Sequence, residues 1–264
     1  MSIELLQQKS AEIRAMRQGF LTNFFLDIVK HGMWIARGDC FIERVGSTLF
    51  IIKKSLTFWN VFYCSTTIDQ FSNDLSTFMS CYSSITMMFD IVGRDMQCKL
   101  MVDLFKGVGC QEATSLVRMT RIADPLAYTA DASIRRAKAT DIPSIIKLLH
   151  EYFDAKTEQI PYEEEILEYA HQGHVLVCEE NGVMEGFLIY EINATTLYLR
   201  YWFTIPNFRN KKVGSRLLRR FLQEGRNTKR QLFWVIRTNE NAIARYRHYG
   251  FKEENMFDYV MQFN

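Results

Sequence analysis

The feature that most constrains the fold is an Asn-Gly pair, Asn181-Gly182, between two strand-like runs. The runs are HVLVCEE before the pair and VMEGFLIYEIN after it. Asn-Gly is the pair that two-residue hairpin turns favour, because both turn residues need positive φ. A third apolar run, TTLYLRYWFTI, follows directly. The second half of the chain is therefore predicted to contain a β-hairpin followed by a third strand.

Helix-like and strand-like segments alternate on both sides of the hairpin. Before it, IRRAKA is predicted to be a strand, followed by a helix with Pro143 in its first turn and a second helix at YEEEILEYAHQG. After it, SRLLRRFLQEGR and NAIARYRHYG are predicted helices, and QLFWVIRT and MFDYVMQF are predicted strands. The order β-α-α-β-β-β-α-β-α-β predicts an α/β domain, a mixed central sheet flanked by helices.

After a long helix predicted at about residues 3–30, the first half repeats the part of this order that begins at the hairpin. Three predicted strands (CFIERV, TLFIIKK, WNVFYCST) lead to a helix, a strand, a second helix and a last strand. The end of the second helix, LFKGVG, aligns with RYRHYG, so that Phe105 corresponds to Tyr246 and Gly109 to Gly250. We interpret this as a divergent tandem duplication. The predicted domains are residues 1–122 and 133–264, joined by a linker at 123–132.

Composition excludes several classes of function. The net charge of the 264 residues is +2, which gives no general attraction to nucleic acid or to acidic membranes. No apolar run is long enough to span a bilayer, so no membrane partner is expected. Six cysteines without CxxC pairs indicate free thiols in a reducing cytoplasm. The pair His171 and His174 lacks ligand partners at suitable spacing, so no metal site is predicted.

A basic loop joins the third strand to the next helix. The run IPNFRNKKVGSRLL contains one glycine, Gly214, and no acidic residue. The start of a helix offers several backbone N–H groups and a positive field, which together suit a phosphate group. Because non-glycine residues rarely adopt positive φ, a right-handed conformation is expected for Lys212 in this loop.

This loop resembles motif A of the GNAT superfamily of N-acetyltransferases. Arg209 matches the first position of the motif, Gly214 matches its last, and Lys212 replaces its first glycine. The run NENAIARYRHYGF is similar to the asparagine-to-tyrosine helix of the same family. The resemblance covers about residues 133–264 and implies the acyl-CoA N-acyltransferase fold.

The resemblance also implies a ligand, acetyl-coenzyme A, and a set of residues that hold it. Loop amides would bind the pyrophosphate, the end of the third strand would pair with the pantetheine arm, and Tyr246 would be the general acid beside the thioester sulfur. The implied cofactor-binding residues are Trp202, Phe203, Thr204, Arg209, Asn210, Lys211, Lys212, Val213, Gly214, Ser215, Asn239 and Ala242. No metal is implied.

The general base is not assigned by the sequence. Glu185 and Glu191 lie on the hairpin strand with the same parity, so they are expected to share a face of the sheet. Glu151, Glu158 and residues 163–165 lie on the early helices, which in this family line the acceptor cleft. A water chain is the alternative to a carboxylate.

The first half is predicted to be a degenerate, non-catalytic copy. Its corresponding loop, STTIDQFSN, has no glycine and contains an acidic residue, Asp69, which would repel a pyrophosphate. Phe105 stands at the position of Tyr246 and has no proton to donate. This half is expected to support the active half or to form a wall of the acceptor pocket.

The leading hypothesis is an N-acetyltransferase that moves an acetyl group from acetyl-coenzyme A to a primary amine by direct attack in a ternary complex. The acceptor is a small molecule or a peptide. The alternatives are a non-catalytic module that binds acyl-coenzyme A and a transferase with a longer acyl donor. Nucleic-acid binding is disfavoured, a cytoplasmic location is expected, and a homodimer is left open.

Overall fold

A computed structural model describes residues 1–124 and 131–264, and the chain divides into two compact units. Unit 1 is Met1–Leu116 with Asn255–Asn264, and unit 2 is Val117–Glu254. Two long strands, β6 (Gln111–Ile122) and β12 (Lys252–Phe263), run from one unit into the other. The predicted domains, residues 1–122 and 133–264, remain a prediction, and residues 125–130 of the predicted linker lie outside the described part.

Unit 2 is built on a mixed sheet with the strand order β6-β11-β10-β9-β8-β7. Neighbours from β7 to β10 are antiparallel, and β10 and β11 are parallel. The predicted hairpin is the pair β8–β9, whose turn residues Asn181 and Gly182 have φ of 52° and 76°. The strands are β7 (Ile134–Arg136), β8 (Val175–Glu180), β9 (Val183–Asn193), β10 (Thr196–Thr204) and β11 (Arg230–Ile236).

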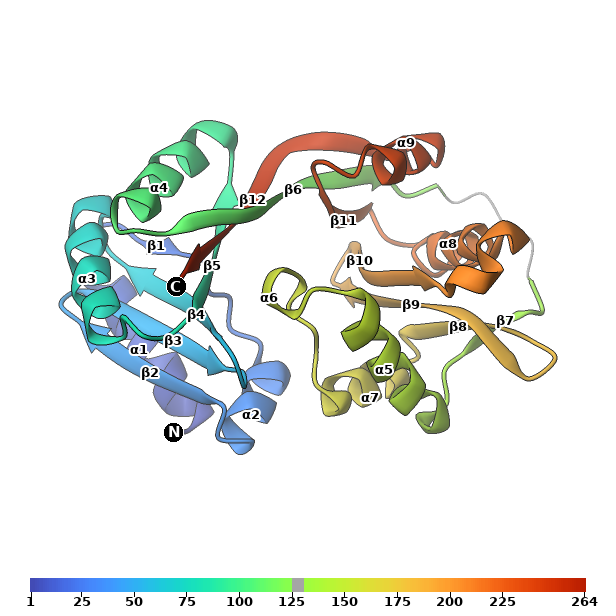
Figure 1. Ribbon diagram of the computed structural model, residues 1–264, viewed down its shortest axis with the longest axis horizontal. Helices are drawn as coiled ribbons and strands as arrows, with labels where there is room; N and C mark the ends of the chain where they lie inside the picture. The colour runs from blue at the N-terminus through green and yellow to red at the C-terminus, as the bar shows by residue number, and fades with distance from the viewer. Residues whose placement is uncertain (125–130) are drawn as a thin grey trace. The chain divides into compact units, whose positions relative to one another are not determined.

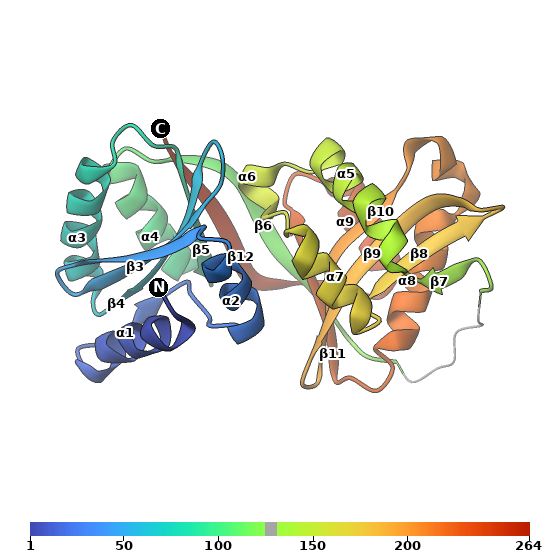
Figure 2. The same ribbon diagram turned by 90° about the horizontal axis from the view of Figure 1, so that it is seen from below.

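Helices cover both faces of this sheet (Figures 1 and 2). On one face, apolar side chains of α5 and α7, such as Ile145, Leu149 and Ile166, pack on Val177 and Phe187 of the sheet. On the other face, α8 packs on β8, β9 and β10. The elements are η1 (Ala139–Asp141), α5 (Ile142–Tyr152), α6 (Ala155–Glu158), α7 (Glu163–His171), η2 (Pro206–Lys211), α8 (Val213–Glu224) and α9 (Glu240–His248).

Unit 1 repeats the arrangement with the strand order β2-β3-β4-β5-β12. Only β4 and β5 are parallel; the other neighbouring strands with a defined register are antiparallel. The short strand β1 pairs with β4 outside this order. The elements are α1 (Ile3–Ala15), β1 (Leu21–Thr22), α2 (Ile28–Ala36), β2 (Cys40–Val45), β3 (Thr48–Lys54), β4 (Trp59–Ser65), α3 (Ile68–Cys81), β5 (Met87–Gly93) and α4 (Asp95–Gly107).

The prediction of one long helix over residues 3–30 is wrong. Helix α1 ends at Ala15, and Arg17 and Gly19 follow with φ of 54° and 111°, which no α-helix accommodates. The chain then enters β1 before α2 begins at Ile28. The predicted segment therefore contains two separate helices, α1 and α2.

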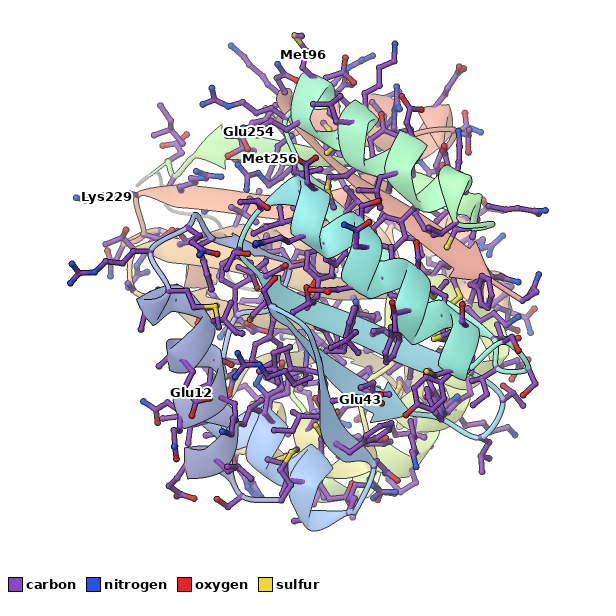
Figure 3. All side chains as sticks on the ribbon, turned by 90° about the vertical axis from the view of Figure 1, so that its left-hand side faces the viewer. Glu12, Glu43, Met96, Lys229, Glu254 and Met256 are labelled. Carbon is purple, nitrogen blue, oxygen red and sulfur yellow. The ribbon has the colours of Figure 1, made fainter. Side chains whose placement is uncertain are left out.

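The two faces of the unit 1 sheet carry different helices. An aromatic core of Phe50, Phe71, Phe78 and Phe105 lies between the sheet and α3 and α4. On the other face, Phe62 of β4 contacts Phe24 and Trp34. In Figure 3, the labelled side chain of Met96 projects from the start of α4, and that of Glu12 lies on α1.

Both units therefore contain the same series of elements. The order β2-β3-β4-α3-β5-α4 in unit 1 matches β8-β9-β10-α8-β11-α9 in unit 2. Gly109 and Gly250, which the sequence aligned, both follow the last helix of the series and have φ of 95° and 83°. The predicted α/β fold, with the same series of elements in both halves of the chain, is confirmed.

Candidate functional site

The parallel strands β10 and β11 separate soon after they begin. Their pairing joins residues 196–198 to residues 230–232 and ends at Tyr198 and Leu232. Strand β10 nevertheless continues to Thr204, paired with β9 on its other edge. The facing edges beyond Tyr198 and Leu232 therefore have backbone N–H and C=O groups that need other partners. An extended ligand that pairs like a strand would satisfy them.

A β-bulge at Arg200 bends β10 where the strands separate. The register with β9 shifts between Leu199 and Tyr201, which leaves Arg200 as the extra residue. Its Nε lies 3.3 Å from Oε1 of Glu191, and the Tyr169 hydroxyl donates a 2.7 Å hydrogen bond to the same oxygen. Burial is the main cause that raises the pKa of Tyr169, so its phenol stays a donor. This cluster stabilises the bend.

The basic loop forms η2 and turns sharply into α8. Lys212 adopts a left-handed conformation with φ 61° and ψ 15°, so the right-handed conformation expected from its sequence is wrong. Lys212 lies at the junction, as the residue that follows η2 and the N-cap position of α8, and the chain changes direction there. A left-handed lysine costs about 1 kcal/mol relative to glycine. The left-handed turn therefore forms here with a lysine in place of a glycine.

The first turn of α8 has no side-chain cap. Lys212 is the N-cap residue, and its side chain makes no capping hydrogen bond. The N–H groups at the start of a helix have no partners within the helix, and the helix dipole adds a partial positive charge there. The Lys212 side chain is exposed and carries a full positive charge. This helix start is therefore suited to bind an anion.

Gly214 lets α8 begin close to the end of β10. A Cβ at this position would lie 3.0 Å from Cζ2 of Trp202 and 3.3 Å from Oγ1 of Thr204. Gly186 of β9 has a similar role, because its Cβ would lie 2.5 Å from the Phe203 carbonyl oxygen and 3.0 Å from Val213. The sequence singled out Gly214 but not Gly186. An isolated glycine within a strand was the available signal.

Glu185 anchors the loop instead of sharing a face with Glu191. Its side chain is 2% exposed, and its two oxygens lie 3.2 Å from Nζ of Lys211 and 3.0 Å from Nη2 of Arg216. The expectation of a shared face is wrong, because Cys178 pairs with Gly186 and Glu179 with Met184. Glu185 is the extra residue of a bulge, which changes the parity of β9. The buried carboxylate holds two basic side chains at the start of α8.

Tyr246 lies on α9 between residues of the two separating strands. Its ring centroid is 4.2 Å from that of Phe233 on β11 and 5.6 Å from that of Trp202 on β10. Burial raises the pKa of Tyr246 to about 12, so the phenol is protonated at neutral pH. The Asn239 side chain caps the same helix by accepting a 3.1 Å hydrogen bond from the N–H of Ala242.

The acidic residues of the early helices lie in different environments. Glu165 is 4% exposed and accepts a 2.8 Å hydrogen bond from the N–H of Tyr162. Glu163 and Glu164 are exposed at the start of α7. Glu158 is half-buried, and burial raises its pKa. A carboxylate with a raised pKa is a better proton acceptor, so Glu158 is a candidate base, although its Oε2 already accepts a 2.8 Å hydrogen bond from the N–H of Asp154.

The structure thus brings the sequence-predicted residues to one end of the unit 2 sheet. Residues 202–204 end β10, and residues 209–215 form the adjoining loop and helix start. Asn239 is the N-cap residue of α9, on which Ala242 and Tyr246 lie.

In the described residues, no group of three or more His, Cys, Asp or Glu side chains is placed to hold a metal ion. Nor does any described helix have the length and apolar character needed to cross a membrane.

Comparisons with known proteins agree with this architecture. The model of the family described as "Acetyltransferase (GNAT) family" matches residues 142–251. No curated protein matches the chain. Among solved structures, a GCN5-related N-acetyltransferase from Sphaerobacter thermophilus is similar with a TM-score of 0.59 and 13% identity, over 81% of this chain and 76% of that chain.

Two further solved structures are similar over most of the chain. A GCN5-related N-acetyltransferase from Kribbella flavida has a TM-score of 0.59 and 11% identity, over 89% of this chain and 93% of that chain. A tandem GNAT protein from the clavulanic acid biosynthesis pathway has a TM-score of 0.58 and 12% identity, over 85% and 83% of the two chains. At such identities the likeness concerns the fold alone.

Proposed function

We propose that unit 2, whose residues 142–251 match the model of the GNAT acetyltransferase family, transfers an acetyl group from acetyl-coenzyme A to a primary amine. The observation that carries this proposal is the separation of β10 from β11 beside the uncapped start of α8. Coenzyme A joins an extended pantetheine arm to a diphosphate. The separated edge of β10 suits the arm, and the adjacent start of α8 suits the diphosphate.

The co-substrate binds through backbone groups for the most part. Its pyrophosphate accepts hydrogen bonds from N–H groups of residues 213–215, and the Lys212 ammonium adds attraction. Its pantetheine amides pair with the edge of β10 at residues 202–204, in the manner of an added strand. The Glu185 carboxylate holds Lys211 and Arg216 in place beside this site.

The chemical step is direct attack by the neutral amine on the thioester carbonyl. The new C–N bond forms as the C–S bond breaks, and a backbone N–H at the end of β10 stabilises the negative charge on the carbonyl oxygen. Tyr246 donates its phenolic proton to the departing sulfur. Glu158, or a water molecule, accepts the proton that the attacking nitrogen loses. The products are an N-acetylated amine and free coenzyme A.

The test is release of free thiol from acetyl-coenzyme A against a panel of small amines and peptides, with the thermal shift produced by coenzyme A measured in parallel. We expect stabilisation by coenzyme A and thiol release with at least one amine. Stabilisation without turnover on any amine would favour a non-catalytic binding module. Turnover with acyl groups longer than acetyl would favour the alternative donor. No stabilisation at all would overturn the proposal.

A further inference from the structure

Unit 1 contains the same strand separation as unit 2. The parallel pairing of β4 and β5 joins Trp59 to Met87 and Asn60 to Met88, and ends there. Strand β4 continues to Ser65, and β5 continues to Gly93. Unit 1 therefore has an opening between these strands, although the loop that follows β4 lacks the features of a phosphate site.

In unit 1, another segment of the chain, β1, pairs with the edge of β4 beyond the point where β5 separates from it. Strand β1 is antiparallel to β4, with Leu21 opposite Ser65 and Thr22 opposite Cys64. The other edge of β4 is paired with β3 over residues 59–64, so β1 lies on the β5 side. The Thr22 hydroxyl also donates a 2.6 Å hydrogen bond to the carbonyl oxygen of Tyr63.

The side chain of Asn23 joins the two separated strands. Its Oδ1 accepts a 2.8 Å hydrogen bond from the N–H of Tyr63 on β4. Its Nδ2 donates a 2.9 Å hydrogen bond to the carbonyl oxygen of Asp90 on β5. A carboxamide offers one acceptor and donors on a planar group, as a backbone amide does. Asn23 thus replaces the ladder hydrogen bonds that β4 and β5 do not make with each other.

The same segment closes the opening at the start of α3. Gly19, with φ 111°, passes so close to the chain that a Cβ would lie 2.9 Å from the carbonyl oxygen of Thr66. The hydroxyl of the N-cap residue Thr67 accepts a hydrogen bond from the N–H of Gln70. Helix α3 is therefore capped by its own N-cap residue, whereas α8 in unit 2 is not.

We propose that residues 19–24 are a built-in ligand of unit 1, which takes the course that the co-substrate arm takes in unit 2. The comparison with the arm rests on the function proposed for unit 2, but the closure of the opening stands on unit 1 alone. The segment makes unit 1 a self-liganded copy with no acyl-coenzyme A site. Its function is to satisfy the backbone of the separated strands, which unit 1 needs in order to stay folded.

The test is hydrogen–deuterium exchange of the full chain, with the Tyr63 amide as the readout. Asn23→Leu removes both bridging hydrogen bonds, and Asn23→Asp keeps the acceptor for Tyr63 but loses the donor to Asp90. We expect Asn23→Leu to speed exchange of the Tyr63 amide by about 100-fold and Asn23→Asp to speed it less. Asn73→Ala, on the exposed side of α3 in the same unit, is the matched control and should leave exchange unchanged.

Wild-type exchange rates at Tyr63 in Asn23→Leu would overturn the proposal. Should that variant fail to fold, Thr22→Val keeps the side-chain volume and removes the hydroxyl that bonds Tyr63. It should then speed exchange across residues 21–24 and 63–65, and unchanged exchange there would overturn the proposal. These readouts require no binding of coenzyme A, so they remain interpretable if the function proposed for unit 2 fails.

Discussion

At the position of Tyr246, the two units differ in one residue, because unit 1 has Phe105 there. The ring of Tyr246 packs against the rings of Phe233 and Trp202. The phenol therefore lies in an environment of low polarity, and burial raises its pKa. The corresponding residue of unit 1, Phe105, is fully buried in an aromatic core. Both residues fill the same kind of helical position, but only the tyrosine has a proton to donate. The proposed chemistry therefore depends on a single hydroxyl.

Removing that hydroxyl should lower turnover far more than binding. We expect Tyr246→Phe to reduce kcat by about 10- to 1000-fold and to change coenzyme A affinity by less than about twofold. The raised pKa, about 12, means that the phenol stays protonated as pH rises to 10. Wild-type kcat should therefore show no loss on the alkaline side up to pH 10 that is due to this group.

Tyr249 provides the matched control for this substitution. It lies three residues later, at the C-cap of α9, where its ring contacts His248. Tyr249→Phe should leave both kcat and affinity at wild-type values in steady-state kinetics and calorimetry. If Tyr246→Phe turns over as fast as Tyr249→Phe, Tyr246 has no part in proton transfer.

At the scale of elements, the start of α8 combines a strained turn with a charge. The left-handed φ of Lys212 favours glycine, whereas its ammonium favours the pyrophosphate. Lys212→Gly should stabilise the folded protein by about 1 kcal/mol relative to Lys212→Ala, because only glycine relieves the strain. Both variants should weaken coenzyme A binding by about 3- to 10-fold at low salt, because both lose the charge.

Salt titration separates the two contributions. The loss of affinity in both variants should shrink as ionic strength rises, since screening weakens the attraction that the wild type gains. Affinity is measured by calorimetry and stability by thermal unfolding. Equal affinity of wild type and Lys212→Ala at low salt would show that Lys212 only tolerates the turn and does not bind phosphate.

The elements of unit 2 were largely predictable because their signals are local. Apolar spacing along α5, the Asn181-Gly182 turn and the glycine after α9 each depend on residues close together in the sequence. Strand β1 was missed because it has two residues and exists only through pairing with β4, more than 40 positions away. No periodicity within residues 3–30 reveals such a partner.

The candidate site was predictable in position but not in detail. Motif spacing indicated residues 209–215 and Tyr246, and these lie at one end of the unit 2 sheet. The conformation of Lys212 and the direction of Glu185 were missed because both depend on neighbouring strands and turns. A bulge reverses the parity of a strand, and its place is decided by pairing that a single sequence does not display.

At the scale of the whole molecule, the two units have the same opening between two parallel strands but fill it differently. In unit 1, Thr22 and Asn23 satisfy the edge of β4, and α3 is capped by Thr67. In unit 2, α8 is uncapped, and Glu185 holds basic side chains beside it. A fold with a gap between two central strands requires a partner for those strands. The two units obtain that partner in different ways.

This asymmetry predicts one molar equivalent of coenzyme A bound per chain. Thr67→Ala and Asp69→Asn in unit 1 should leave the affinity and the stoichiometry in calorimetry unchanged, because the opening of that unit is closed by residues 19–24. Gly214→Val, the contrasting change in unit 2, should abolish binding, since its side chain would collide with Trp202 and push α8 from β10. A second equivalent of coenzyme A bound by the wild type, or binding retained by Gly214→Val, would contradict the assignment of one coenzyme A site to unit 2 and none to unit 1.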